Sequence, residues 1–154
     1  MAGLDNRIPP PLVMVATGLA MAGIAALVAA PLPLPPGPRW GLAGALFLLA
    51  GGYGFPAIGA FARAGTTINP VAIDRASVLV TTGPFGRSRN PMYVSMALLL
   101  TALALALDNA AALAGPLLFV AFITRFQILP EERAMAARFG AAYADYRCRV
   151  RRWL

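Results

Sequence analysis

Two short segments, about forty residues apart, hold the residue types best suited to chemistry. The first, residues 77–93, combines turn residues with Arg89-Asn90-Pro91 and an aromatic residue on either side. Backbone at the start of a helix can cradle a ligand there, although the arginines could equally contact lipid phosphates. The second segment begins with Glu131 and Glu132. A carboxylate there can accept hydrogen bonds from a ribose diol or an ammonium group, although paired acids also simply favour a helix start.

The residue types that are absent exclude several kinds of catalysis. All thirteen basic residues are arginine, and histidine does not occur. The chain therefore has no imidazole base, no His-ligated zinc or haem, no Schiff-base lysine and no P-loop lysine. Cys148 is the single cysteine and cannot form an internal disulfide. We predict no metal site and no nucleophilic thiol.

The composition places most of the chain in lipid. Hydrophobic residues make up 59% of the 154 residues and charged residues 12%, compared with roughly 45–50% and ~25% in globular proteins. A chain of this length cannot bury so much apolar surface in one core. A net charge of +7 would suggest nucleic acid in a soluble protein, but apolar stretches separate these arginines. We expect a protein of the lipid bilayer that binds no nucleic acid.

Four apolar runs are expected to form membrane-spanning helices. A hydrocarbon core of ~30 Å needs about 20 helical residues. The proline-rich stretch 31–38 separates the first two runs, and Asp108-Asn109 forms a tight turn between the last two. These last runs are short, which indicates a hairpin in a locally thinned bilayer. The predicted fold is an all-α integral membrane protein in one domain, with spans over about 12–30, 40–62, 92–107 and 110–127.

The arginines indicate how these spans are oriented. Twelve of the thirteen lie in the N-terminal segment, the loop 63–91 or the C-terminal region, and Arg39 alone lies on the other side. The positive-inside rule then places both termini in the cytoplasm. We expect a multi-pass protein of a bacterial inner membrane. None of the six acids lies within a predicted span, which argues against a proton-coupled exporter.

The tail, residues 128–154, is expected to be a cytoplasmic amphipathic helical segment. Pro130 before two acids favours a helix start, and Gly140 is a suitable end for that helix. A second short helix over 141–150 would carry Tyr143, Tyr146 and Val150 on one face.

The order of these motifs resembles a known enzyme family. Leu79-Val80-x-x-Gly83-Pro84-Phe85 is followed by Arg89-Asn90-Pro91-x-Tyr93, then by Glu131-Glu132 and by Phe139-Gly140-x-x-Tyr143-x-x-Tyr146-x-x-Arg149-Val150. The combination, over residues 63–150, is similar to the isoprenylcysteine carboxyl methyltransferase family. Phospholipid methyltransferases have a similar membrane core. The first two spans carry no family signature.

The resemblance implies S-adenosylmethionine as the methyl donor, bound on the cytoplasmic side. Position by position, it implies a donor site made of Ser77, Val78, Leu79, Val80, Phe85, Arg89, Asn90, Pro91, Met92, Tyr93 and Glu131. An aromatic ring there could face the sulfonium cation. The candidate catalytic residues are Glu132, Arg125 and Gln127. Methyl transfer from an activated donor can depend largely on positioning, so histidine and lysine are not needed.

The sequence departs from the family pattern at two places. Asn90 stands where the prenylcysteine enzymes usually have histidine, and Gln127 stands where they place an arginine for the substrate carboxylate. The nearest arginine is Arg125. We therefore expect a lipophilic or lipidated acceptor, reached from the bilayer between the helices, without identifying its nucleophilic atom.

Two other functions account for part of the pattern. NADPH-dependent membrane reductases of the sterol reductase type have a similar C-terminal layout, but should show extra basic residues for the 2′-phosphate and more spans. A non-catalytic membrane subunit could pack through small residues such as Gly18-x-x-x-Ala22. That interpretation leaves the acidic pair without a role. The sequence does not determine the oligomeric state.

Overall fold

The computed structural model describes residues 5–65 and 78–154, and this part of the chain is helical, without a strand. Its elements, in chain order, are α1 (Pro10–Leu27), α2 (Pro36–Arg63), η2 (Gly83–Gly86), α3 (Pro91–Ala106), η3 (Ala111–Leu113), α4 (Ala114–Ile123), the π-helical turn η4 (Thr124–Ile128) and α5 (Leu129–Arg149). The predicted all-α class is confirmed for these residues.

Prolines determine where the first three long helices begin. α1, α2 and α3 each have proline in the first helical turn, where a missing N–H costs nothing because first-turn amides have no partner within the helix. For the same reason α2 already begins at Pro36, inside the stretch 31–38 that we predicted to be a non-helical connector.

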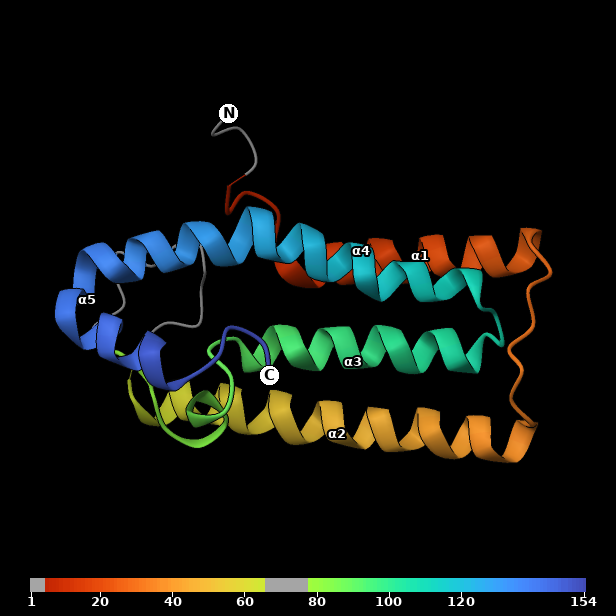
Figure 1. Cartoon of the computed structure of the whole chain (residues 1–154), viewed down its shortest axis with the longest axis horizontal. Helices are drawn as coiled ribbons and strands as arrows, with labels where there is room; N and C mark the ends of the chain where they lie inside the picture. The colour runs from red at the N-terminus through yellow and green to blue at the C-terminus, as the bar shows by residue number, and fades with distance from the viewer. Residues whose placement is uncertain (1–4, 66–77) are drawn as a thin grey trace.

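The four helices α1 to α4 lie side by side with their axes roughly aligned (Figure 1). α2 packs mainly against α3, and α4 lies against both α1 and α3. The α1–α2 and α3–α4 connections meet at one end of the bundle, whereas η2 and α5 lie at the other. Residues that are distant in sequence therefore come together at each end.

Three helical stretches are long and apolar enough to cross a membrane: α1, α2 and the continuous run Ala111–Arg149. α3 is apolar but has 16 residues, which is about 24 Å at 1.5 Å per residue, compared with a core of ~30 Å. Because α3 contacts α1, α2 and α4, it is the central helix of the bundle. Its role as a fourth span stays a prediction.

The fourth predicted span and the tail form one helical run, where we expected a new helix after Pro130. Pro130 has no N–H for the carbonyl of Phe126, four residues earlier. That carbonyl instead accepts a hydrogen bond of 3.0 Å from the backbone N–H of Asn6. The π-helical turn η4 widens the helix directly before this proline. A segment 120 residues away in the sequence thus supplies a donor for the carbonyl that the proline leaves without its usual helical partner.

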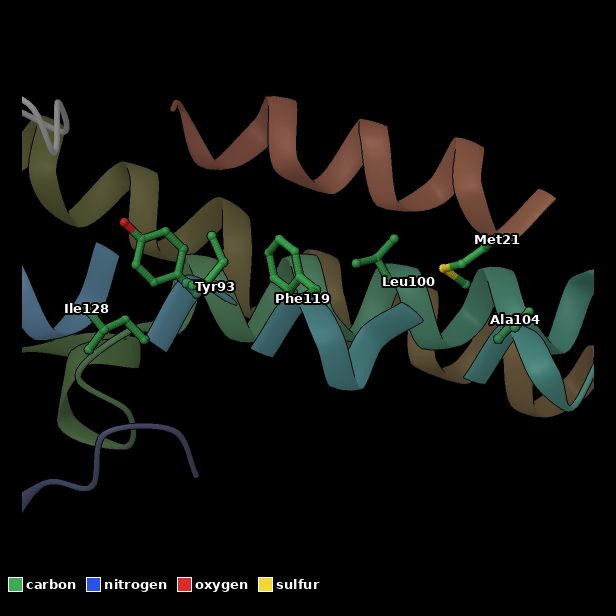
Figure 2. Packing of buried hydrophobic residues seen from close by; sticks show 8 residues of the cluster. Met21, Tyr93, Leu100, Ala104, Phe119 and Ile128 are labelled. Carbon is green, nitrogen blue, oxygen red and sulfur yellow. The ribbon is translucent and has the colours of Figure 1, made fainter. Parts of the chain in front are cut away.

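The core of the bundle lies between α1, α3 and α4 (Figure 2). Its buried members are Met21, Tyr93, Leu100, Ala104, Ala112, Phe119, Ile123 and Ile128. Gly115 of α4 allows α1 to approach closely, because a Cβ atom at this position would lie 2.4 Å from both Cγ and Sδ of the buried Met21.

We expect Gly115→Ala to destabilise the bundle by about 1–3 kcal/mol, because an added methyl group overpacks this contact. Gly23→Ala in α1 is the matched control, since a Cβ atom there meets nothing within 4 Å. Thermal unfolding of both variants in detergent measures the difference. Equal melting temperatures would contradict the close α1–α4 contact.

Polar contacts join the two connections at the end of the bundle away from α5. Arg39 forms an ion pair with Asp108, and the buried Asn109 donates a hydrogen bond of 2.7 Å to the carbonyl of Val28. The guanidinium of Arg39 and the backbone N–H of Leu32 lower the pKa of Asp108. The predicted turn at Asp108-Asn109 is confirmed, with Asp108 at a φ of 51°.

Candidate active site

Four segments meet at the other end of the bundle. They are the stretch 78–90, the first turn of α3, the first turn of α5, and residues 150–153, which we call the C-terminal strap. α5 bends back at Gly140, the one non-helical residue within it, with φ 50° and ψ −122°. Glycine adopts this conformation without a Cβ clash. The bend directs the strap towards the start of α3 (Figure 1).

Tyr93 and Glu131 form the first polar contact of the site. Tyr93 lies in the first turn of α3, and its buried hydroxyl group donates a hydrogen bond of 2.7 Å to Oε1 of Glu131 in the first turn of α5. The carboxyl group of Glu131 is therefore hydrogen-bonded to an uncharged phenol group. No guanidinium contacts Glu131 among the described residues, and burial raises the pKa of its carboxyl group to about 7.

Glu132, one residue later, has the opposite surroundings. Arg89 donates from Nη2 to Oε1 at 2.6 Å, and Arg152 donates from Nε to Oε1 at 2.9 Å and from Nη2 to Oε2 at 2.8 Å. We call these three residues the Glu132 clasp. Glu132 is 7% exposed, and its carboxylate raises the pKa of Arg152. The two neighbouring acids thus differ in charge balance: Glu132 is neutralised by arginines, whereas Glu131 is not.

The C-terminal strap is held against the Ser88-Arg89-Asn90 segment through backbone carbonyl groups. The carbonyl of Arg152 accepts a hydrogen bond of 2.9 Å from Nδ2 of Asn90 and one of 3.4 Å from Oγ of the buried Ser88. The backbone N–H of Arg89 donates to the carbonyl of Arg151 at 2.9 Å. Nη1 of Arg89 donates to the carbonyl of Val150 at 2.8 Å.

The apolar side chains of the predicted donor site divide between two clusters. Val80 and Phe85 are buried against Ala57 and Ala60 of α2, with Met92 packed beside them. The ring of Phe85 meets Phe61 edge to face at 5.2 Å. Leu79 instead packs against the cluster of Tyr143, Tyr146 and Val150. The hydroxyl group of Tyr146 donates a hydrogen bond of 2.7 Å to the carbonyl of Phe85, which links the two clusters.

Arg125 and Gln127, two of the predicted catalytic residues, lie in a different cluster. Arg125 pairs with Asp5 at 3.5 Å, and its side chain is 49% exposed. Gln127 is 1% exposed and donates from Nε2 to the carbonyl of Ile8 at 2.7 Å, and its Oε1 has no partner. Both side chains therefore contact the N-terminal segment rather than the acidic pair.

The structure brings most of the predicted donor residues to the end of the bundle where α5 lies, but they differ in their contacts and in their exposure. Tyr93, Glu131, Arg89 and Asn90 make the polar contacts described above, Pro91 is fully buried, and Val78 is exposed. Ser77 lies outside the described residues. Sequence reasoning missed Arg152, Ser88 and Asp5. The surplus of arginines in the tail was the available signal for Arg152, but no local spacing relates it to Glu132, twenty residues earlier.

An apolar groove with a volume of about 440 Å³ lies between α1 and α4. Its lining includes Val13 of α1 and Phe119 and Phe122 of α4. Phe119 also belongs to the buried cluster that contains Tyr93. Phe119 therefore connects the groove with the buried cluster that includes Tyr93 of the polar site.

The apolar helices and the polar cluster at one end define a helical membrane protein with a candidate site at that end. Residues 39–142, more than half of the chain, match the family model of phospholipid methyltransferases. The chain belongs to this family and is a membrane methyltransferase. The predicted membrane methyltransferase class is confirmed at this level, and the isoprenylcysteine subfamily stays a prediction.

The chain is also similar to an uncharacterized protein of Haemophilus influenzae. The two are 43% identical over 63 residues, which cover 41% of this chain and all of the relative. No solved structure matches the chain.

Proposed function

We propose that this protein transfers a methyl group from S-adenosylmethionine to a lipophilic acceptor at the cytoplasmic face of a bacterial inner membrane. Membership of a membrane methyltransferase family supports the reaction class. The observation that carries the choice of donor is the setting of Glu131, whose carboxyl group contacts the neutral hydroxyl group of Tyr93 and leaves room for a cationic partner, which would favour its ionised form.

The residues at the site fit the chemistry of this donor. S-adenosylmethionine carries a sulfonium and an ammonium group, and supplies an activated methyl group when bound. A carboxylate without a cationic partner attracts such charges, and the ring of Tyr93 beside it is suited to a cation. Glu131 would hold the ammonium or a ribose hydroxyl group, and Tyr93 would orient that carboxylate. Arg89, Asn90 and the neighbouring backbone would form the wall of the site.

The reaction requires positioning and exclusion of water more than acid–base chemistry. The buried side chains of Val80 and Phe85 pack at this end of the bundle, and the buried ring of Tyr93 gives Glu131 an apolar neighbour. Glu132, Arg125 and Gln127 remain proposed catalytic residues. For Glu132, the contacts with Arg89 and Arg152 favour a role in holding the site together.

The groove between α1 and α4 supports a lipophilic acceptor, because it offers a hydrocarbon chain an apolar surface next to the core around Tyr93. The position of Gln127, which is hydrogen-bonded to Ile8 and holds no positive charge, does not favour a carboxylate acceptor at that residue. An isoprenylcysteine carboxylate therefore has less support than other lipids.

Calorimetric titration of the detergent-purified full chain with S-adenosylhomocysteine tests the donor, with NADPH titrated in parallel. We expect saturable binding of S-adenosylhomocysteine and none of NADPH. Binding of NADPH alone would place the protein with the sterol-type reductases. Binding of neither would contradict the proposed donor site.

The native cysteine gives a direct test of the proposed orientation. Cys148 is exposed at the site end of the molecule, so a membrane-impermeant maleimide should label it in inverted inner-membrane vesicles and not in intact spheroplasts. The matched control is Cys148→Ser combined with Leu34→Cys in the α1–α2 connector, where Leu34 is exposed. This variant should show the reverse pattern. Labelling of Cys148 from the outside would overturn the orientation.

A further inference from the structure

The contacts of Arg152 extend the candidate site to the C-terminal strap. Both acids of the pair contact the same five-residue stretch: Arg89 binds Glu132, and Tyr93 binds Glu131. Arg152 adds two charged hydrogen bonds to Glu132, and its own carbonyl accepts from Asn90. A single residue of the strap therefore contacts both the stretch 89–93 and the first turn of α5.

We propose that Arg152 is a positioning residue for the donor site, an inference that rests on the proposed function. Arg152 acts through Glu132: by fixing this carboxylate with a two-pronged contact, it fixes the first turn of α5 and so the direction of Glu131. By accepting from Asn90, it also holds the segment before α3 in place.

The charge of Arg152 has a second effect. Two adjacent carboxylates repel each other, and this repulsion disfavours their ionised forms. With Arg89 and Arg152 both in contact, Glu132 is neutralised where it stands. Without Arg152, only the guanidinium of Arg89 contacts the acidic pair. The side chain of Glu132 can then turn towards solvent and lose its fixed position. The carboxylate of Glu131 would then lose its fixed direction towards the donor.

The test compares Arg152→Gln with Arg151→Gln, which removes the same charge one residue earlier from an exposed side chain. Each full-length variant is titrated with S-adenosylhomocysteine well below its melting temperature. We expect Arg152→Gln to weaken binding by about tenfold, the effect of Glu131 losing one charged hydrogen bond to the donor when it is no longer held in place. Arg151→Gln should bind as the parent does. Arg152→Lys should recover part of the affinity, because it restores the charge without the planar fork.

A second control separates positioning from general stability. Gly115→Ala weakens helix packing away from the site, so it should lower the melting temperature and keep the parent affinity. If Arg152→Gln binds S-adenosylhomocysteine as tightly as the parent, with or without a lower melting temperature, the positioning role is wrong. If Arg152→Gln does not fold, parent-like binding by Glu132→Gln, which removes the other partner of the same contact, overturns the proposal in the same way. A parent protein that binds no S-adenosylhomocysteine contradicts the proposed function instead, so the two failures are distinguishable.

Discussion

Glu131→Gln should weaken the binding of S-adenosylhomocysteine by about ten- to a hundredfold while the protein stays folded. Glutamine has nearly the same shape and can still accept the hydrogen bond from Tyr93, so the change removes the negative charge and little else. Loss of a hydrogen bond between charged groups costs roughly 1.5–3 kcal/mol, which corresponds to about this range of affinity. Calorimetric titration of the purified variant measures the effect.

Asp145→Asn is the matched control for this experiment. Asp145 is an exposed acid of α5 whose backbone carbonyl accepts a hydrogen bond from Arg149, so the same chemical change in its side chain should leave the affinity unchanged. Unaltered binding by Glu131→Gln would show that its charge does not serve the donor. The assignment of the acidic pair to the site would then be wrong.

Glu132→Gln, one residue later, should mainly destabilise the fold. This carboxylate is buried, and it contacts Arg89, whose side chain is 9% exposed, and Arg152, whose side chain is 35% exposed. Removing one partner of a buried ion pair typically costs about 3–5 kcal/mol. We expect the free energy of unfolding to fall by about 3 kcal/mol, at the low end of this range, because the unpaired side chain of Arg152 can turn towards solvent. For a chain of this size the melting temperature should fall by roughly 10 °C.

Thermal unfolding in detergent measures this loss, and Glu131→Gln serves as the neighbouring control with the same chemical change. Its partner is a neutral hydroxyl group, so its melting temperature should stay close to that of the parent. Because the Glu132 clasp also positions Glu131, Glu132→Gln should bind the donor analogue more weakly as well. A parent-like melting temperature for Glu132→Gln would contradict the buried ion pairs.

Sequence reasoning predicted the helices well, because their signals are local. Charge-free apolar runs and prolines near their ends place α1, α2 and α3 within a few residues of their predicted ranges. The predicted helix start at Pro130 matches α5, which begins at Leu129 with Pro130 in its first turn, but the expected break before it is absent and η4 joins α4 to α5. Asn6, far away in the chain, donates to the carbonyl of Phe126 there. A local pattern carries no information about such a distant donor.

The candidate site was predictable as a region, but not as a set of contacts. Glu131 and Tyr93 were both assigned to the donor site, and they are hydrogen-bonded to each other. Phe85 was also assigned to that site as a possible partner of the sulfonium, yet its ring is buried against Phe61 of α2. The spacing of residues along a loop does not show which way an aromatic side chain points when a neighbouring helix offers it a packing surface.

The sequence by itself determined that the helices are apolar enough for a lipid bilayer and that most polar residues gather at one end of them. Those properties depend on composition and on the order of apolar and charged runs, which folding does not change. The tertiary structure alone decided that Glu132 pairs with Arg89 and Arg152, whereas Glu131 meets the neutral hydroxyl group of Tyr93. Adjacent residues of a helix point in directions about 100° apart, so their partners depend on which segments pack on each side.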